Sequence, residues 1–188
     1  CFRLHGTMNW DINLNMLSYQ HIYHAGNMAD VQKHLWLLTV LEYLSRKDKP
    51  YVWIDTHAGR GAYDLRASEA EKLGEYKSGI AAVLDRIKGA EHPILQLYVQ
   101  KIAALNGGDS VVQIYPGSSV LAAQMLREDD RLFSFDLHPK EFEFLSANMK
   151  SYQGADARKE DGYTGLKSLV PPQIRRGGVL IDPSYEIK

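Results

Sequence analysis

The four residues Asp182-Pro183-Ser184-Tyr185 carry the groups that an enzyme needs to alkylate an exocyclic amine. A conjugated nitrogen, such as the amino group of adenine, is a poor nucleophile because its lone pair spreads into the ring. The Asp182 carboxylate and the Pro183 carbonyl can accept both N–H bonds and turn the lone pair toward a methyl donor. Asp182 can then accept or relay the released proton, and Tyr185 can stack on a flipped base. Taken alone, the same residues predict only a turn, since proline fixes φ and Asp and Ser favour loops.

A second run of residues has the pattern of a nucleoside-binding loop. The apolar stretch 51–54 ends at Asp55 and leads into a turn that contains Gly59 and Gly61. In α/β folds such a turn lets the backbone approach the ligand, and an acid that ends a later strand hydrogen-bonds the ribose. We assign Gly59 to the turn and Asp136 to the ribose. A dinucleotide fingerprint would need a third glycine at the position of Asp64, which disfavours NAD.

Acidic residues close four of the expected strands. In a parallel sheet the carboxyl ends of the strands lie at one edge, where open α/β sheets bind ligands, so these acids should gather there. Each acid is also a common N-cap for the helix that follows, and that alternative stays open. The four acids are Asp55, Asp136, Asp161 and Asp182.

Strands and helices alternate along the chain, which is the pattern of a parallel sheet with crossover helices. We expect a first helix from Asn27 to the basic turn before Pro50, capped by Asn27, and a later helix capped by Ser118. The sequence therefore predicts an α/β fold. The expected strands are 51–55, 111–115, 131–136, 157–160 and 178–182. The helix capped by Ser118 is 119–127, and the other expected helices are two between 74 and 105, then 140–150 and 163–169.

Composition excludes several classes of protein. No stretch reaches the roughly 20 apolar residues of a membrane helix. The single cysteine, Cys1, has no partner within the chain, which excludes a disulfide framework and fits a reducing cytoplasm. A net charge of −1 gives no global attraction to nucleic acid, and solvated turns explain the local basic clusters equally well. His21, His24 and His57 lack the spacing of a zinc site, so we expect no metal.

A series of motifs in matching order resembles the RlmJ-type 23S ribosomal RNA (adenine-N6)-methyltransferase family. The resemblance runs from Met16 to Lys188. It implies a class I S-adenosylmethionine-dependent methyltransferase with a Rossmann-like sheet and a small helical insertion at about 66–110. The motifs are Met16-Leu17-Ser18-Tyr19-Gln20-His21, His24-Ala25-Gly26-Asn27, Ala29-Asp30-Val31, Lys33-His34, Asp55-Thr56-His57-Ala58-Gly59, Tyr115-Pro116-Gly117-Ser118, Leu137-His138-Pro139, Asp161-Gly162 and Asp182-Pro183.

The resemblance also implies roles for single residues and for partners. The catalytic group would comprise Asp182 and Pro183, with Tyr185 beside them, and the substrate side would comprise Tyr19, His21 and Lys33. The implied cofactor is S-adenosyl-L-methionine, and the implied partner is ribosomal RNA in the cytoplasm, bound by a monomer that needs neither membrane nor metal. Together with the turn residue Gly59, the implied cofactor contacts are His34, His57, Ser118, Asp136, Asp161 and Gly162.

The chain departs from the family pattern at three points. Ser184 stands where the family usually has a second proline, which loosens the carbonyl that should hold the amine. Asp136 stands where the family has the longer Glu, and the C-terminal strands of the family's sheet are missing. We interpret residues 1–15 as a non-native or disordered extension and 16–188 as a truncated methyltransferase domain.

The arm from Met16 to Asn27 is expected to lie over the catalytic edge near Asp182. Its aromatic and imidazole rings can stack on splayed RNA bases, whereas the alternative is an arm that only covers the sheet edge. Two other functions stay open. One is methylation of another planar amine, in DNA adenine or protein glutamine, and the other is non-catalytic binding of nucleic acid, linked to the use of external DNA.

Overall fold

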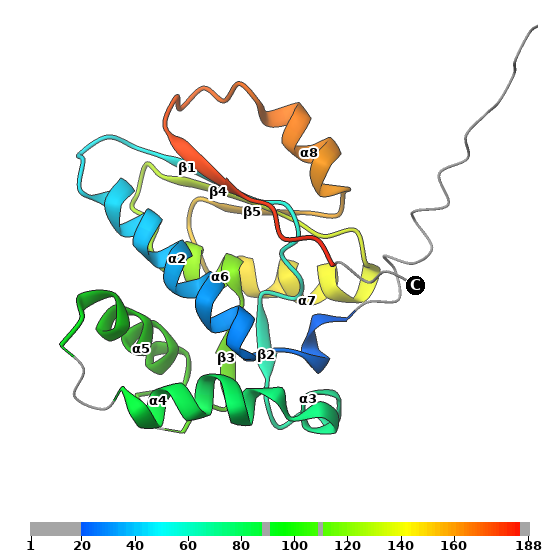
Figure 1. Ribbon diagram of the computed structural model, residues 1–188. Helices are drawn as coiled ribbons and strands as arrows, with labels where there is room; N and C mark the ends of the chain where they lie inside the picture. Colours follow the sequence, from blue (N-terminus) through cyan, green and yellow to red (C-terminus); the bar gives the residue numbers. More distant parts are fainter. Residues whose placement is uncertain (1–19, 88–90, 109–110, 185–188) are drawn as a thin grey trace, which may run out of the picture.

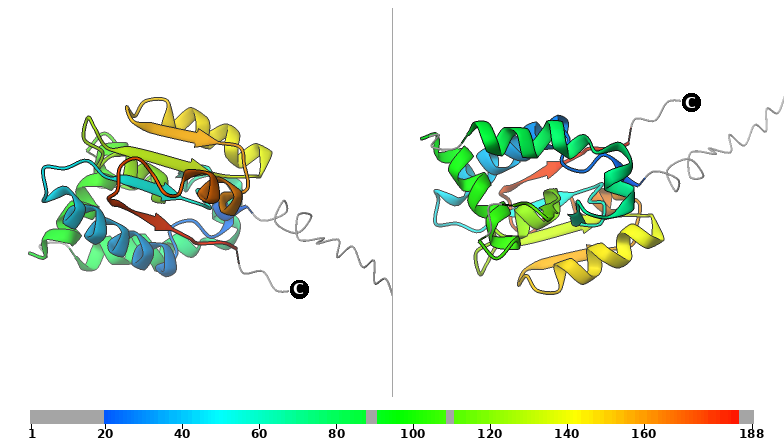
Figure 2. Two further views of the ribbon diagram at one scale, coloured as in Figure 1. Left: turned by 90° about the horizontal axis from the view of Figure 1, so that it is seen from above. Right: turned by 90° about the horizontal axis from the view of Figure 1, so that it is seen from below.

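Four parallel strands form the central sheet of the computed structural model, which describes residues 20–87, 91–108 and 111–184. The interpreted extension, residues 1–15, lies outside these ranges. The arrows of the four strands point the same way in Figure 2, so the expected α/β class with a parallel sheet is confirmed. In the spatial order β5-β4-β1-β6, the strands are Ala155–Arg158, Arg131–Phe135, Val52–Asp55 and Gly177–Leu180.

Helices cover both faces of this sheet (Figure 1). On one face lie α2 (Met28–Ser45), α6 (Ser118–Ala123) and α7 (Pro139–Met149), and on the other lies α8 (Gly162–Leu169). Successive side chains of a strand point to opposite faces. Trp53 of β1 therefore joins the larger core, whereas Val52 and Ile54 join a smaller one that packs against α8. Because both faces are covered, β1 is buried along its whole length, as its uninterrupted apolar sequence predicts.

One expected strand lies outside the parallel sheet. Residues 111–115 were expected to contribute a parallel strand, but β3 (Ile114–Pro116) pairs antiparallel with β2 (Ala62–Asp64), a strand that the sequence pattern did not predict. The turn after β1 carries the chain straight into β2, and the Gly117 amide donates to the Gly61 carbonyl at 2.7 Å. A strand this short carries too few residues to show alternation, which is why the local sequence does not reveal it.

The two predicted helix caps have different outcomes. Asn27 caps α2 as expected, because its side chain accepts a hydrogen bond from the Asp30 amide. The prediction for Ser118 is wrong, since Gly117 occupies the N-cap position of α6 and Ser118 is the first helical residue. The Ser118 hydroxyl instead donates to the buried carboxylate of Asp55 at 2.6 Å. Hydrogen bonding to a buried charge takes precedence here over hydrogen bonding to a helix amide.

A helical segment lies on the same side of the sheet as α2 (Figure 1). It comprises α3 (Ser68–Leu73), the π-helical turn η2 (Lys77–Ala81), α4 (Ala82–Arg86) and α5 (Pro93–Leu105), so it begins earlier than the two helices expected between 74 and 105. Gly79 contacts the chain ahead of α2 so closely that a Cβ would lie 2.0 Å from the Gly26 carbonyl oxygen. In the described ranges, no helix is long and apolar enough to cross a membrane.

Candidate active site

A cavity of about 910 Å³ runs along the carboxyl edge of the parallel sheet. This volume lies within the range of small-molecule and cofactor sites in proteins. The walls come from the chain ahead of α2, from α2 itself, and from the loops that follow β1, β4, β5 and β6. The lining includes every residue for which a cofactor contact was expected, namely His34, His57, Gly59, Ser118, Asp136, Asp161 and Gly162.

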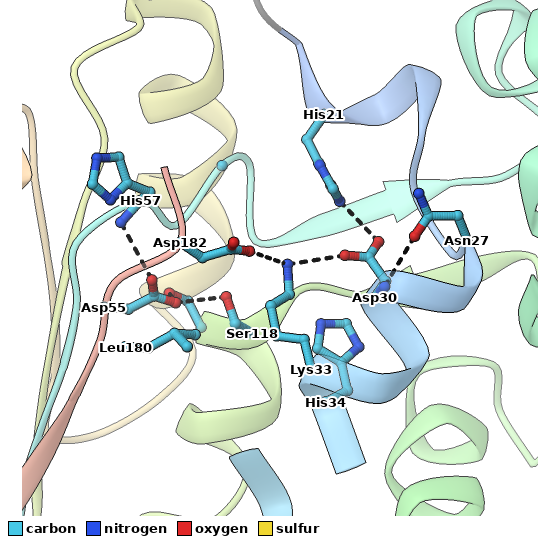
Figure 3. Close-up of polar contacts among 12 residues, drawn as sticks. His21, Asn27, Asp30, Lys33, His34, Asp55, His57, Ser118, Leu180 and Asp182 are labelled. Carbon is cyan, nitrogen blue, oxygen red and sulfur yellow. Dashed lines mark hydrogen bonds and ion pairs between the residues drawn. The ribbon is translucent and has the colours of Figure 1, made fainter. Parts of the chain in front are cut away.

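Asp182 lies at this edge, in the loop beyond the end of β6, and forms an ion pair with Lys33 of α2 (Figure 3). The Lys33 ammonium lies 2.8 Å from Asp182 Oδ2 and 2.9 Å from Asp30 Oδ1. Burial alone would lower the pKa of Lys33, but the two carboxylates outweigh it and raise this pKa. Lys33 therefore stays charged and holds the Asp182 carboxylate against α2.

Asp30 connects this ion pair to the chain ahead of α2. Its carboxylate is buried and also accepts hydrogen bonds from His21 Nε2 at 2.8 Å and from the Gly26 amide at 3.0 Å. Burial would raise the pKa of Asp30, yet the hydrogen bond from His21 and the charge of Lys33 outweigh it and hold this pKa far below its ordinary value. The result is a continuous chain of contacts from His21 through Asp30 and Lys33 to Asp182 (Figure 3).

The described part of the arm, residues 20–27, lies at the cavity. It contains the short helix η1 (His21–Tyr23), and His21, His24 and Asn27 line the cavity. Glu75 of the helical segment holds it in place, since its two carboxylate oxygens lie 2.9 Å from His24 Nδ1 and 3.0 Å from Asn27 Nδ2. The substrate-side prediction for Tyr19 lies outside the described residues.

The glycine turn after β1 is tied to Asp136 at the end of β4. The Gly59 amide donates to Asp136 Oδ2 at 2.9 Å, and the His138 amide donates to Oδ1 at 2.8 Å. Gly59 has a φ of 60°, and a Cβ on it would lie 2.3 Å from the Tyr63 hydroxyl, so this position requires glycine. Each Asp136 oxygen keeps a second lone pair, which leaves the carboxylate able to accept from ligand hydroxyls.

The environment of Asp136 favours its protonated form more than that of an ordinary aspartate. Burial, with a contribution from the nearby Glu141 carboxylate, raises the pKa of Asp136 to about 6, against the opposing effect of the two backbone amides. At neutral pH the group is therefore mostly ionised, but it titrates just below that range.

Asp55, the first of the four strand-end acids, supports the wall of the cavity and does not line it. Asp55 ends β1 at the same edge of the sheet, but unlike the other three acids it is fully buried and does not line the cavity. Its carboxylate accepts from Ser118 Oγ at 2.6 Å and from Ser119 Oγ at 2.8 Å, and burial raises its pKa. Asp55 thus orients the wall of the cavity from behind. Because the Ser118 hydroxyl donates its hydrogen bond to Asp55, it can act toward the cavity only as a hydrogen-bond acceptor.

Two histidines have a buried ring nitrogen without a hydrogen-bond partner among the described residues. His57 Nδ1 pairs with the Thr56 hydroxyl at 2.8 Å, and His34 Nδ1 pairs with the Tyr115 hydroxyl at 2.9 Å. In both rings Nε2 is the unpartnered atom, and both residues line the cavity. Burial lowers the pKa of each ring, that of His34 to about 3. Buried polar atoms are normally hydrogen-bonded, so these two nitrogens fit contact with a ligand.

Asp161 and Gly162 form the start of α8 beside the cavity. Asp161 accepts hydrogen bonds from the Thr164 amide and hydroxyl, both at 2.8 Å, so it is a helix N-cap. A Cβ on Gly162 would lie 1.9 Å from the Thr56 carbonyl oxygen, which explains why only glycine fits there. The capping alternative is therefore correct for Asp161, and the residue lines the cavity as well.

The loop that holds Asp182 is anchored at its start. The Leu180 carbonyl accepts from the Thr56 amide at 3.1 Å and from the Thr56 hydroxyl at 3.0 Å. Pro183 and Ser184 follow Asp182 along the cavity wall. The prediction that Tyr185 stacks on a base falls outside the described residues.

Sequence reasoning missed several residues that build this site. Asp30 and Tyr115 were named only as members of the family motifs, and Glu75 and Tyr98 were not singled out. A charged residue on the apolar side of a helix is the signal that could have identified Asp30. Over the described ranges, no three His, Cys, Asp or Glu side chains gather in a way that could hold a metal ion.

Comparison with known proteins identifies close relatives. A family model described as "Ribosomal RNA large subunit methyltransferase D, RlmJ" matches residues 48–188. Proteins named ribosomal RNA large subunit methyltransferase J, from Haemophilus influenzae and Escherichia coli, are 42% and 41% identical to this chain over 173 residues. Each match covers 92% of this chain, which spans 61% of the length of either relative. A crystal structure of a Legionella pneumophila protein superposes with a TM-score of 0.79 at 40% identity, covering 87% of this chain and 59% of that one.

Proposed function

The chain belongs to the RlmJ family of ribosomal RNA large subunit methyltransferases, and from this premise we propose that it transfers a methyl group from S-adenosylmethionine to N6 of an adenine in 23S ribosomal RNA. One observation carries the proposal. A single cavity contains both a nucleoside-type loop, with Gly59 and Asp136, and the paired carboxylate of Asp182. An enzyme that joins a nucleoside cofactor to an amine needs these two groups in one space.

The residues present fit this cofactor. Gly59 and Gly162 bring backbone to the cavity wall where a Cβ would collide, and Asp136 keeps lone pairs for ribose hydroxyls. The unpartnered Nε2 atoms of His34 and His57 supply further polar contacts. Ser118 and Asp161 add oxygen acceptors. When bound, the cofactor supplies the electrophilic methyl group.

Asp182 and Pro183 hold the target amine in this proposal. Lys33 contacts Oδ2 of Asp182 in the described part of the chain, so Oδ1 and the Pro183 carbonyl are the acceptors for the two N–H bonds. Binding both hydrogens turns the nitrogen lone pair away from the loop and toward the methyl donor. As the nitrogen gains the methyl group it becomes acidic, and the proton passes to the Asp182 carboxylate. No stronger base is needed.

Tyr19, His21, Lys33 and Tyr185 are the residues that we propose for the substrate side. Lys33 supplies a cation 2.8 Å from the catalytic carboxylate, and His21 acts through Asp30, to which it is bonded. The helices over 68–105 belong to the proposed helical insertion, about 66–110, of a methyltransferase domain over 16–188. We also propose a cytoplasmic monomer that needs no metal; the described residues that line the cavity all belong to one chain.

A methyl-transfer assay tests the proposal against its alternatives. Labelled S-adenosylmethionine is incubated with the protein and with stripped ribosomal RNA, duplex DNA or protein as acceptors. We expect label in ribosomal RNA, recovered as N6-methyladenosine after nuclease digestion. Label in DNA or in protein glutamine would replace the proposed substrate. Nucleic-acid binding without transfer to any acceptor would favour the non-catalytic function.

A further inference from the structure

Three buried side chains from three elements form a row of hydrogen bonds that ends at the cavity. Tyr98 of α5 and Tyr115 of β3 lie with their hydroxyl oxygens 2.8 Å apart, and the Tyr115 hydroxyl lies 2.9 Å from Nδ1 of His34 on α2. The Tyr98 hydroxyl is also 3.4 Å from the same Nδ1. None of the three residues is more than 1% exposed. His34 lines the cavity, and its Nε2 has no partner among residues 20–87, 91–108 and 111–184.

Counting protons determines which ring nitrogen of His34 carries the hydrogen. If Nδ1 is an acceptor, Tyr98 donates to Tyr115 and Tyr115 donates to Nδ1, so both hydroxyl protons are used. If Nδ1 carries a proton, three protons share two oxygen acceptors. The two hydroxyls cannot donate to each other at once, so one buried hydroxyl proton then has no acceptor among the described residues. The cost of leaving this buried hydroxyl proton without an acceptor favours the Nε2–H tautomer over the Nδ1–H tautomer by about fivefold or more.

We propose that Tyr115, backed by Tyr98, is a positioning residue that fixes His34 as the Nε2–H tautomer, so that the cavity receives a neutral N–H donor for an oxygen acceptor of the bound cofactor. This inference rests on the proposed function and assigns a direction to one of its contacts. Burial keeps the ring neutral, because it lowers the pKa of His34 to about 3. The partner on the nitrogen opposite to the ligand sets the tautomer, as it does for metal-bound histidines.

The helical segment thereby supplies a second hydroxyl behind His34, although Tyr98 itself is not among the residues that line the cavity. Tyr98 lies on α5, and α5 packs against α2, which carries His34. A change on α5 that removes the Tyr98 hydroxyl leaves the shorter row of Tyr115 and His34. In that row the single hydroxyl proton still goes to Nδ1. Only removal of both hydroxyls frees the tautomer.

Nitrogen NMR of protein labelled at its histidine rings reads the tautomer directly. The His34 signals are assigned by their absence from a His34→Gln protein. In the unmodified protein we expect Nδ1 to resonate as an unprotonated nitrogen and Nε2 as a protonated one. The Tyr98→Phe/Tyr115→Phe protein should show both nitrogens shifted toward their average. Tyr98→Phe alone should retain the parent pattern, as should the control Tyr51→Phe, which removes a buried hydroxyl that bonds the Met125 carbonyl.

Adding S-adenosylhomocysteine supplies the second measurement. We expect Nε2 to stay protonated in the complex, with its proton shifted downfield, and the double variant to bind at least about twofold more weakly in calorimetry, the factor expected when the competent form is half populated. A protonated Nδ1 in the unmodified protein, or an unchanged pattern in the double variant, would overturn the inference. So would mixed tautomers with unchanged affinity. If the double variant does not fold, the spectrum of the unmodified protein still decides the tautomer. Failure of the unmodified protein to bind S-adenosylhomocysteine would instead refute the proposed cofactor.

Discussion

The carboxylates of the site show how surroundings give one residue type different tasks. Asp30 is buried but has His21 and the Lys33 cation beside it, so its pKa lies far below the ordinary value. Asp136 accepts hydrogen bonds from two backbone amides, and burial raises its pKa to about 6. Asp30 is therefore suited to hold charged groups in place at any physiological pH. Asp136 is suited to bind neutral hydroxyls while it remains ionised.

Cofactor affinity should depend on pH through Asp136. Ribose hydroxyls donate to the ionised carboxylate, so affinity for S-adenosylhomocysteine should be highest above pH 7 and fall as the pH drops through about 6. Asp136→Asn should weaken binding at pH 8 by about 1–3 kcal/mol, the cost of a lost charged acceptor. The same variant should also lose most of the pH dependence. Calorimetry from pH 5 to 8 measures both effects, and an identical pH profile in the variant would remove Asp136 from the ligand contacts.

Replacing Asp30 by Asn should destabilise the protein. The amide keeps the shape of the side chain but leaves Lys33 and His21 without their shared buried anion, which should cost about 1–3 kcal/mol in the free energy of unfolding at pH 7. Because the folded pKa lies below the ordinary 3.8, the stabilisation is complete above about pH 4 and is lost as the pH falls further. Urea unfolding at pH 7 and at pH 3 should therefore show a smaller difference between parent and variant at pH 3.

The matched control for this prediction is Glu42→Gln. It removes the carboxylate of an exposed helix-surface ion pair with Arg46 and should leave the unfolding midpoint unchanged. If Asp30→Asn has no more effect than this control, the buried ion pairs do not stabilise the fold.

At the level of elements, the helical segment helps to hold the arm ahead of α2. Glu75 bonds His24 and Asn27, the Ile80 amide donates to the Gly26 carbonyl at 2.8 Å, and Gly79 allows the close approach. Residues 24–27 thus connect the helical segment to the wall of the cavity, which His24 and Asn27 line. Because packing holds this stretch in place, it belongs to the scaffold of the cavity.

Deleting residues 1–20 should separate the substrate role of the arm from its packing. The buried anchor Ile22 and the stretch 24–27 remain, so thermal stability and affinity for S-adenosylhomocysteine should stay close to those of the full chain. Methyl transfer to ribosomal RNA should fall sharply, because the proposed stacking group Tyr19 is lost. Thermal melting, calorimetry and the transfer assay measure the three quantities. Parallel losses of stability and activity would show that the arm only covers the sheet edge.

For the molecule as a whole, the sequence predicted the features that local patterns encode. The buried run of β1 and the Asn27 cap could be read directly, because burial on both faces and an orphan helix amide each select characteristic residues. β2 could not be read, since three residues show no period and its partner strand lies far along the chain. Lys33 and Asp182 are separated by 149 positions, so no local pattern reveals their ion pair.

For the acids at the strand ends, the sequence likewise predicted the location in the sheet but not every contact. Their gathering at one edge follows from parallel topology, so it was predictable for Asp136 and Asp161. The burial of Asp55 behind the cavity depends on Ser118 and Ser119, which approach it only in the folded chain. An acid at a strand end therefore predicts that the residue lies at this edge of the sheet, but it does not predict which side chains bond it.

The central claim is that Asp182 receives the target amine in a cavity where other residues bind the cofactor. The most direct test is the Asp182→Ala protein, in which S-adenosylhomocysteine affinity is measured by calorimetry and transfer of labelled methyl to ribosomal RNA is measured in parallel. We expect affinity within about twofold of the parent, because Asp182 belongs to the amine side of the cavity, and loss of methyl transfer by a factor of about 100 or more. Methyl transfer at the parent rate would contradict the claim.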